Sequence, residues 1–155
     1  MPLYFAYGSN LLLSQIRERT ENKNLKPIFI AYIENAKLIF PRPSKNQKDG
    51  VASFKHSNNS KVWGAVFELN DEEIKRLNEY EGYEPGGKDN AYEQKEIEVV
   101  KLDGSKVKVV TYIANKLGNF KPSKQYMEKI IKGAKECGLP EEYIEELKKI
   151  EMNEE

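Results

Sequence analysis

The sequence of 155 residues has few of the groups that define metal sites, disulfide scaffolds or membrane proteins. Its single cysteine, Cys137, excludes an internal disulfide and predicts a reducing, cytoplasmic environment. The single histidine, His56, has no partners at metal-ligand spacing, so we expect no metal. Apolar runs are far below the roughly 20 residues of a membrane helix, and the first residues lack a signal-peptide pattern. We therefore expect neither a membrane span nor a leader.

An excess of charge of one sign is absent too. The 25 Lys and Arg residues balance the 25 Asp and Glu residues, so no bulk field attracts the protein to nucleic acid or to an anionic membrane. Charged residues make up 32% of the chain and hydrophobic residues 39%, which predicts a surface dense in Lys and Glu. The length suits a single domain, residues 1–155, whose core needs no metal or disulfide.

Short apolar segments separated by turn residues predict a strand-rich fold. Segment 41–49 is polar and proline-bearing and predicts a loop, residues 57–60 predict a turn, and Asp103-Gly104 predicts a hairpin. The strands expected from this pattern cover residues 2–7, 27–33, 36–40, 51–54, 62–69, 91–102 and 106–114.

Helix start and stop signals predict four helices among these strands. Asn70 and Glu73 have the spacing of a capping box, and Gly82 is placed to end their helix. The expected helices cover residues 11–19 capped by Asn10, 71–81, the stretch from Ser123 to Gly138, and a last helix opened by Pro140. The combination predicts an α+β domain with a small mixed β-barrel or curved sheet and flanking helices.

The acid Glu81 stands out by its phase on the helix over 71–81. At about 100° per residue, Ile74, Leu77 and Glu81 share one face, whereas Glu79 points elsewhere. An acid at the end of an apolar stripe is partly desolvated, which raises its pKa and makes it a stronger base. Periodicity alone leaves open a plainer interpretation, in which this helix-end side chain bends out to water.

The loop Tyr7-Gly8-Ser9-Asn10 lies where a strand gives way to an expected helix start. Backbone N–H groups at such a place favour a carboxylate or an oxyanion, and glycine lets a ligand approach the backbone. An ordinary capped turn explains the same pattern. Ser9 does not stand in a G-x-S-x-G elbow, so we do not expect a serine nucleophile.

Three segments together resemble one family, the γ-glutamylcyclotransferases. Tyr4-Phe5-Ala6-Tyr7-Gly8-Ser9-Asn10 resembles the family's N-terminal signature. Leu77-Asn78-Glu79-Tyr80-Glu81-Gly82 resembles its acidic motif, in which a Glu precedes a Gly. The stretch Pro122 to Glu151 is also similar to family members. The likeness covers nearly the whole chain in order and shifts the interpretation of Glu81 toward catalysis.

The resemblance implies a small barrel-like fold with flanking helices and a cofactor-free enzyme. In the implied reaction, the α-amine of a γ-glutamyl amide attacks the γ-carbonyl and yields 5-oxoproline plus a free amino acid or amine. The resemblance places the general acid/base role on Glu81 and a substrate contact on Tyr126, for which a core-edge aromatic is the alternative. The resemblance to the family also leaves open that the protein forms a homodimer. The substrate pocket is implied to be lined by Tyr4, Phe5, Ala6, Tyr7, Gly8 and Ser9.

Two questions stay open at the level of sequence. Glu84 is a rival acid, and the segment Gly82 to Asn90 could set which leaving group fits. The substrate could be a γ-glutamyl amino acid, a γ-glutamyl amine or a biosynthetic intermediate with a γ-glutamyl cap. An alternative of another class is a non-catalytic module that keeps the fold and binds a small molecule.

Overall fold

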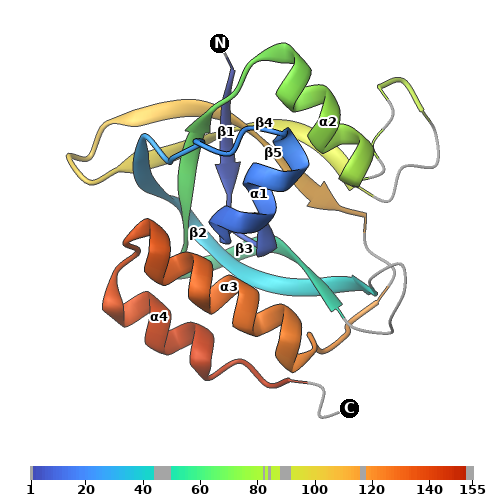
Figure 1. Cartoon of the computed structure of the whole chain (residues 1–155). Helices are drawn as coiled ribbons and strands as arrows, with labels where there is room; N and C mark the ends of the chain where they lie inside the picture. The colour runs from blue at the N-terminus through green and yellow to red at the C-terminus, as the bar shows by residue number, and fades with distance from the viewer. Residues whose placement is uncertain are drawn as a thin grey trace.

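A computed structural model describes residues 2–43, 50–81, 83, 85–87, 92–115 and 118–152. In this part of the chain five strands form a closed barrel, with helices packed around it (Figure 1). The expected α+β class, a small mixed barrel with flanking helices, is confirmed. The strands are β1 (Leu3–Ala6), β2 (Phe29–Pro43), β3 (Gly50–Glu68), β4 (Tyr92–Lys101) and β5 (Lys106–Ala114). The helices are the 3₁₀ turn η1 (Ser9–Leu11), α1 (Leu13–Thr20), α2 (Asp71–Glu81), α3 (Lys124–Cys137) and α4 (Glu141–Lys148).

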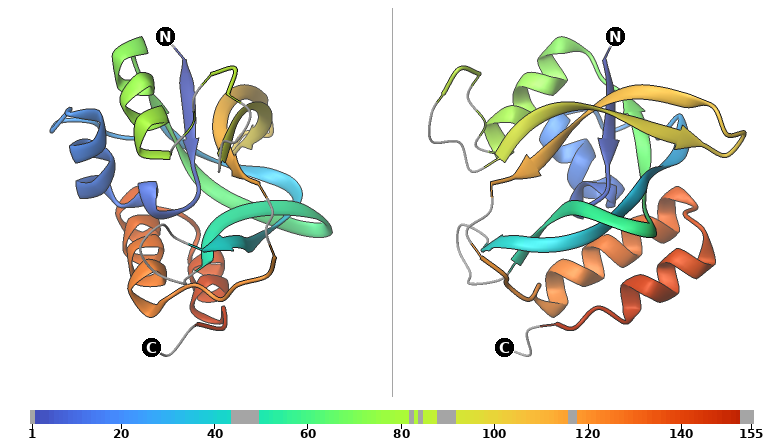
Figure 2. Two further views of the ribbon diagram at one scale, coloured as in Figure 1. Left: turned by 90° about the vertical axis from the view of Figure 1, so that its right-hand side faces the viewer. Right: turned by 180° about the vertical axis from the view of Figure 1, so that it is seen from behind.

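The barrel follows the order β1-β3-β2-β4-β5 and closes between β5 and β1. Neighbouring strands are antiparallel except for this closing pair, in which Tyr4 is opposite Val110. The hydroxyl of Thr111 donates to the Phe5 carbonyl at 2.7 Å and fastens the two strands. Figure 2 shows α1 and α2 on one side of the barrel and α3 and α4 across one end.

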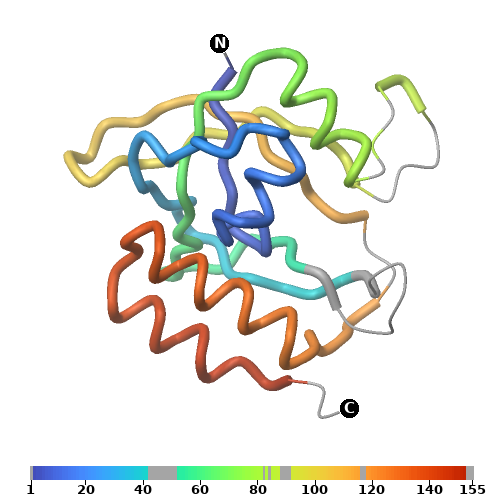
Figure 3. Tube along the Cα trace, viewed as in Figure 1, coloured from blue at the N-terminus to red at the C-terminus, as the bar shows by residue number. Residues whose placement is uncertain are grey.

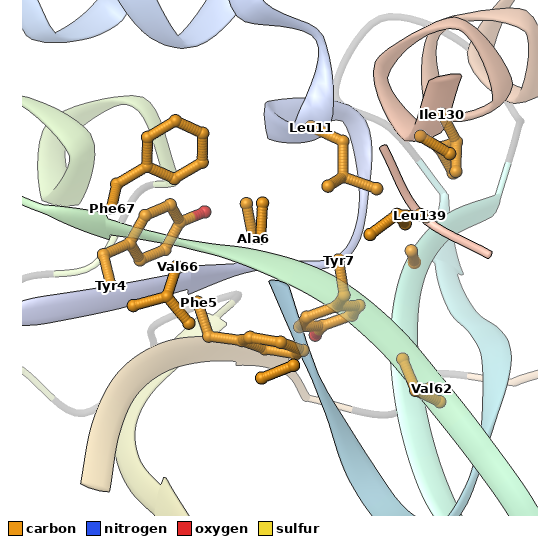
Figure 4. Close-up of a cluster of buried hydrophobic side chains, with 14 of the residues drawn as sticks. Tyr4, Phe5, Ala6, Tyr7, Leu11, Val62, Val66, Phe67, Ile130 and Leu139 are labelled. Carbon is orange, nitrogen blue, oxygen red and sulfur yellow. The ribbon is translucent and has the colours of Figure 1, made fainter. Parts of the chain in front are cut away.

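The short strand β1 is buried on both faces. Tyr4, Phe5, Ala6 and Tyr7 each expose 5% or less of their surface. Such burial explains why this strand shows no alternation of polar and apolar residues. In Figure 4 its side chains lie within the core cluster, with Leu11 of η1 near Ile130 and Leu139. The loop that follows β1 therefore starts from a buried part of the core.

The hairpin of β2 and β3 departs from the strands expected from sequence. Four shorter strands were predicted here, but β2 and β3 each run unbroken. Asn35 and Asn59 adopt left-handed φ values of 51° and 64°, and the Asn59 N–H donates to Asn35 Oδ1 at 3.2 Å. Residues 57–60 oppose Asn35 across a register shift. Asparagine tolerates this conformation, so the expected break is a bulge that bends the hairpin without ending it.

The expected loop over 41–49 is also partly wrong. Residues 41–43 belong to β2, because they continue its pairing with β3. Residues 44–49 lie outside the described part of the chain, as do Gly82, the expected helix stop, and the rival acid Glu84.

The cap predictions for α2 and α3 are confirmed. In α2 the Asn70 N–H donates to Glu73 Oε1 at 2.9 Å, and the Glu73 N–H donates to Asn70 Oδ1 at 2.8 Å. Ser123 caps α3 by accepting the Tyr126 N–H at 3.0 Å. That helix ends at Gly138, whose φ is 76°. These signals lie within a few residues of one another, which is why sequence was sufficient to find them.

The predicted cap for α1 is wrong. Asn10 belongs to η1, and α1 begins only at Leu13, with Leu12 at the N-cap and no side-chain cap. The Leu13 N–H instead donates to the Glu136 carboxylate of α3 at 3.0 Å. A carboxylate of the protein itself therefore lies at the N-terminus of α1, beyond the loop Tyr7 to Asn10 whose backbone N–H groups the sequence suggested as an anion site.

Helix α3 packs directly on the backbone of η1 and the residue after it. A Cβ added to Gly133 would lie 2.3 Å from the Leu11 carbonyl carbon and 2.4 Å from the Leu12 nitrogen. The chain after β1 therefore runs between the two helix pairs at backbone distance from α3 (Figure 3). None of the helices in the described part is long and apolar enough to cross a membrane.

Candidate active site

Glu81 is the last residue of α2, and its side chain is 17% exposed. Leu77, one turn earlier on the same face, is fully buried, Ile74 is half-buried and Glu79 is exposed. The helix phasing expected from sequence is thus confirmed. Glu81 points toward the protein while keeping a limited opening to solvent, which is the placement a proton-transfer group needs.

Glu81 meets the loop after β1 through two polar contacts. Asn10 Nδ2 donates to Glu81 Oε1 at 3.4 Å, which is at the long end for a hydrogen bond. Arg19 of α1 forms an ion pair with the same carboxylate, with its Nη1 3.9 Å from Glu81 Oε1. The guanidinium of Arg19 also stacks over the ring of Tyr80, with its carbon 5.1 Å from the ring centre. The acid and the loop, 71 positions apart in the chain, therefore face one another.

Asn10 is 4% exposed and is the centre of this network. Its Oδ1 accepts from Gln15 Nε2 at 3.1 Å and from Arg19 Nη1 at 3.0 Å. Its Nδ2 donates to the Tyr4 hydroxyl at 3.0 Å in addition to Glu81. Tyr4 and Asn10, at the two ends of the N-terminal signature, are thus bonded to each other directly.

Tyr126 approaches the other side of the loop from the first turn of α3. Its hydroxyl oxygen accepts the Ala52 N–H at 2.9 Å, and a Cβ on Gly8 would lie 3.3 Å from that oxygen. Burial raises the pKa of Tyr126 to about 12, the charge of Glu81 adds to the rise, and the Ala52 N–H and Ser9 oppose it. Gln15 Nε2 also donates to Ser9 Oγ at 2.8 Å, so Gln15 links Ser9 to Asn10.

Three further tyrosines share the electrostatic environment of Glu81. Burial raises the pKa values of Tyr4, Tyr7 and Tyr112, and the negative charge of Glu81 raises each of them further. The Tyr7 hydroxyl donates to the Tyr112 carbonyl at 2.6 Å, and the Tyr112 hydroxyl donates to Asn78. All these phenols therefore remain protonated at neutral pH and act as neutral hydrogen-bonding groups around the carboxylate.

The structure sorts the expected site residues into two groups. Phe5, Ala6 and Tyr7 have side chains in the core, whereas Gly8 and Ser9 are half-buried. The residues that share contacts or electrostatic interaction around the loop and the acid are Tyr4, Tyr7, Gly8, Ser9, Tyr126 and Glu81.

Sequence reasoning missed three members of the network, namely Asn10 in this role, Gln15 and Arg19. Gln15 and Arg19 are four residues apart in α1 and so share one helix face. That spacing was the available signal, but it is equally common among residues on solvated faces.

Other features of the described residues lie away from this network. No group of three or more His, Cys, Asp or Glu within that part of the chain could hold a metal ion. A cavity of about 480 Å³ lies between α4 and the β2–β3 hairpin and includes none of the expected site residues. Its lining includes Lys37, Lys61, Trp63, Tyr143 and Glu146.

Comparison with known proteins agrees with the fold. The AIG2-like family matches residues 61–147. The gamma-glutamylcyclotransferase of Mus musculus is 38% identical, with 98% of this chain and 80% of the relative covered. The Homo sapiens gamma-glutamylcyclotransferase is 36% identical, over 97% of this chain and 79% of the relative. A solved structure of a gamma-glutamyl cyclotransferase superposes with a TM-score of 0.88 at 34% identity, covering 99% of this chain and 90% of that one.

Proposed function

The chain belongs to the AIG2-like family, and its relatives include γ-glutamylcyclotransferases. From this membership we propose the following reaction. The enzyme converts γ-glutamyl amino acids, or related γ-glutamyl amides, into 5-oxoproline and a free amino acid or amine. Glu81 is its general acid and base. The observation that carries this assignment is the meeting of Glu81 with the loop after β1 through Asn10.

The chemistry needs one group that first takes and then returns a proton. The substrate's α-ammonium loses a proton, and the resulting amine attacks the γ-carbonyl carbon and forms the ring C–N bond. The bond to the departing nitrogen then breaks, that nitrogen takes up a proton, and the ring nitrogen releases its second proton to solvent, which leaves the neutral lactam N–H of 5-oxoproline. A single carboxylate can serve both steps, because the proton gained in the first is the proton given in the second. Intramolecular attack supplies a large rate advantage once the substrate is held in the ring-closing shape.

The loop and Tyr126 are proposed to hold the substrate in that shape. Gly8 and Ser9 are the half-buried end of the expected binding segment, whereas Tyr4 to Tyr7 form the wall behind it. The Tyr126 oxygen already accepts the Ala52 N–H, so its own hydrogen is available to a substrate oxygen. Its pKa of about 12 keeps this donor protonated at neutral pH.

The proposed reaction is tested by incubating the protein with γ-glutamyl amino acids, γ-glutamyl amines and γ-glutamyl-capped intermediates and measuring 5-oxoproline. We expect release from at least one class, and the preferred class identifies the leaving group. No release from any of them would favour the non-catalytic binding module with the same fold.

The assignment of Glu81 is tested by Glu81→Gln, which keeps the shape of the side chain and removes the base. We expect activity to fall by about 10²-fold or more with folding intact. Glu79→Gln is the matched control, because Glu79 is an exposed acid on the same helix. Glu84→Gln tests the rival acid, and the assignment to Glu81 is wrong if Glu84→Gln abolishes turnover while Glu81→Gln does not.

We further propose a single-domain, cytoplasmic enzyme that acts without a cofactor, either as a monomer or as a homodimer. The single cysteine is compatible with a reducing compartment. Light scattering of the purified protein distinguishes the two oligomeric states.

A further inference from the structure

Asn10 uses all of its hydrogen-bonding capacity in the described structure. Its carbonyl oxygen has two donors, Gln15 and Arg19, and its amide nitrogen has two acceptors, Tyr4 and Glu81. An asparagine side chain offers two acceptor sites and two N–H donors. Because Gln15 Nε2 and Arg19 Nη1 are donors, they face the carbonyl oxygen of Asn10, and its amide nitrogen faces Glu81. In the reverse orientation the amide nitrogen would face these two donors and the carbonyl oxygen would face the Glu81 carboxylate.

We propose that Asn10 is a positioning residue that orients the Glu81 carboxylate toward the loop, with Arg19 as the cation that faces the same carboxylate oxygen. The proposal rests on the proposed acid/base role of Glu81. Neither residue needs to touch the substrate in order to act in this way.

The fold supports Asn10 through its backbone and through its side chain. Its backbone is part of η1, in which the Leu11 N–H donates to the Gly8 carbonyl at 3.0 Å. The backbone around Leu11 is itself pressed against Gly133 of α3. The Tyr4 hydroxyl, from the buried strand β1, fixes the amide end. A donor supported on three sides can hold a flexible glutamate in one direction, which a proton-transfer group requires.

Arg19 supplies the positive charge on this side of Glu81. An opposite charge within about 4–6 Å favours the ionised carboxyl and lowers its pKa, typically by about 1–3 units, while burial acts in the other direction. We therefore expect removal of the cation to raise the pKa of Glu81 and to reduce the fraction of base at mildly acidic pH. Within the described part of the chain, the neighbouring side chains that bond to Glu81 or sense its charge include Asn10, Arg19, Tyr4, Tyr7, Tyr112 and Tyr126.

Three variants test the roles of Asn10 and Arg19. Asn10→Asp keeps the size but replaces both N–H donors by a second carboxylate, so we expect kcat to fall about tenfold or more with a smaller change in KM. Arg19→Gln removes the charge and keeps a donor, so we expect the acidic limb of the kcat/KM profile to move up by about one pH unit. Arg19→Lys retains the charge, so we expect the acidic limb of its kcat/KM profile to lie within a few tenths of a pH unit of that of the unmodified protein.

The control is Arg76→Gln. Arg76 of α2 pairs with Glu21 at 2.7 Å and bonds the Thr20 carbonyl. It therefore bridges α1 and α2, as Arg19 does, but not at Glu81. This variant reports the loss of helix–helix contacts away from Glu81, so we expect its pH profile to match that of the unmodified protein.

A second readout does not depend on turnover. The carboxyl carbon of Glu81 is titrated by ¹³C NMR, with its signal identified by its absence in Glu81→Gln. We expect its midpoint to rise in Arg19→Gln and in Asn10→Asp and to stay unchanged in Arg76→Gln.

The outcomes separate the two proposals. An active protein with the same Glu81 midpoint and the same profile in Arg19→Gln overturns the role of Arg19. Unchanged kcat in folded Asn10→Asp overturns the role of Asn10. In both cases the proposed function stands. If the unmodified protein releases no 5-oxoproline from any substrate, the proposed function is overturned. The proposed role of Asn10 and Arg19 in catalysis is then overturned as well.

Discussion

Replacing Gly133 by alanine is expected to destabilise the protein, although the residue lies inside a helix, where alanine is usually preferred by about 1 kcal/mol. The added Cβ would lie 2.3 Å from the Leu11 carbonyl carbon, and ordinary contact begins at 3.4 Å, so a shift of about 1 Å is required. The opposing atoms are backbone, so no rotamer change relieves the clash. Overpacking of this kind costs typically about 1–3 kcal/mol and occasionally more. A contact of 2.3 Å with backbone belongs at the upper end of this range, about 2–3 kcal/mol, so with the propensity gain subtracted we expect a net loss of about 1–2 kcal/mol.

The same shift acts on the proposed site, because Leu11 directly follows Asn10. A misplacement of about 1 Å can cost about 10²-fold in rate, so kcat/KM should fall by this order even at temperatures where the variant is fully folded. Urea unfolding measures the stability, and 5-oxoproline release measures the activity. Lys132→Ala, on the exposed face of the same helix, is the control for helix propensity. A Gly133→Ala protein that is as stable as the parent and equally active would refute the backbone contact between α3 and η1.

Other substitutions and conditions test the environment of Tyr126 and Cys137. Tyr126→Phe leaves the Ala52 N–H without its acceptor, so we expect a loss of about 1–3 kcal/mol in urea unfolding together with a higher KM. Alkaline pH should destabilise the protein. With a folded pKa of about 12 for Tyr126, the unfolded chain releases this proton first, so the contribution of Tyr126 to stability is constant below pH 10 and about 2–3 kcal/mol of it is lost between roughly pH 10 and 12. Stability that stays level to pH 12 contradicts this. Burial raises the pKa of Cys137 to about 11, so iodoacetamide should label the native protein at pH 7 much more slowly than the urea-unfolded chain.

Local signals in the sequence predicted the features whose causes are local. The capping box of Asn70 and Glu73, the Ser123 cap and the phase of Glu81 all depend on residues within a few positions, and the structure has each of them. The strand breaks at Asn35 and at residues 57–60 were predicted from equally local signals and were wrong. A turn and a bulge use the same residue types, and only the partner strand decides between them.

The sequence by itself therefore determined the element types, most of the caps, the family and the two segments of the proposed site. Only the tertiary structure decided what Asn10 does. As a local residue it had the chemistry of a helix cap, but the closed barrel places Tyr4 and Glu81 within reach of its amide. Arg19 and Gln15 then take its carbonyl oxygen. Because an amide has a limited number of hydrogen bonds, these tertiary partners leave none for the helix, and the predicted cap becomes the link between the loop and Glu81.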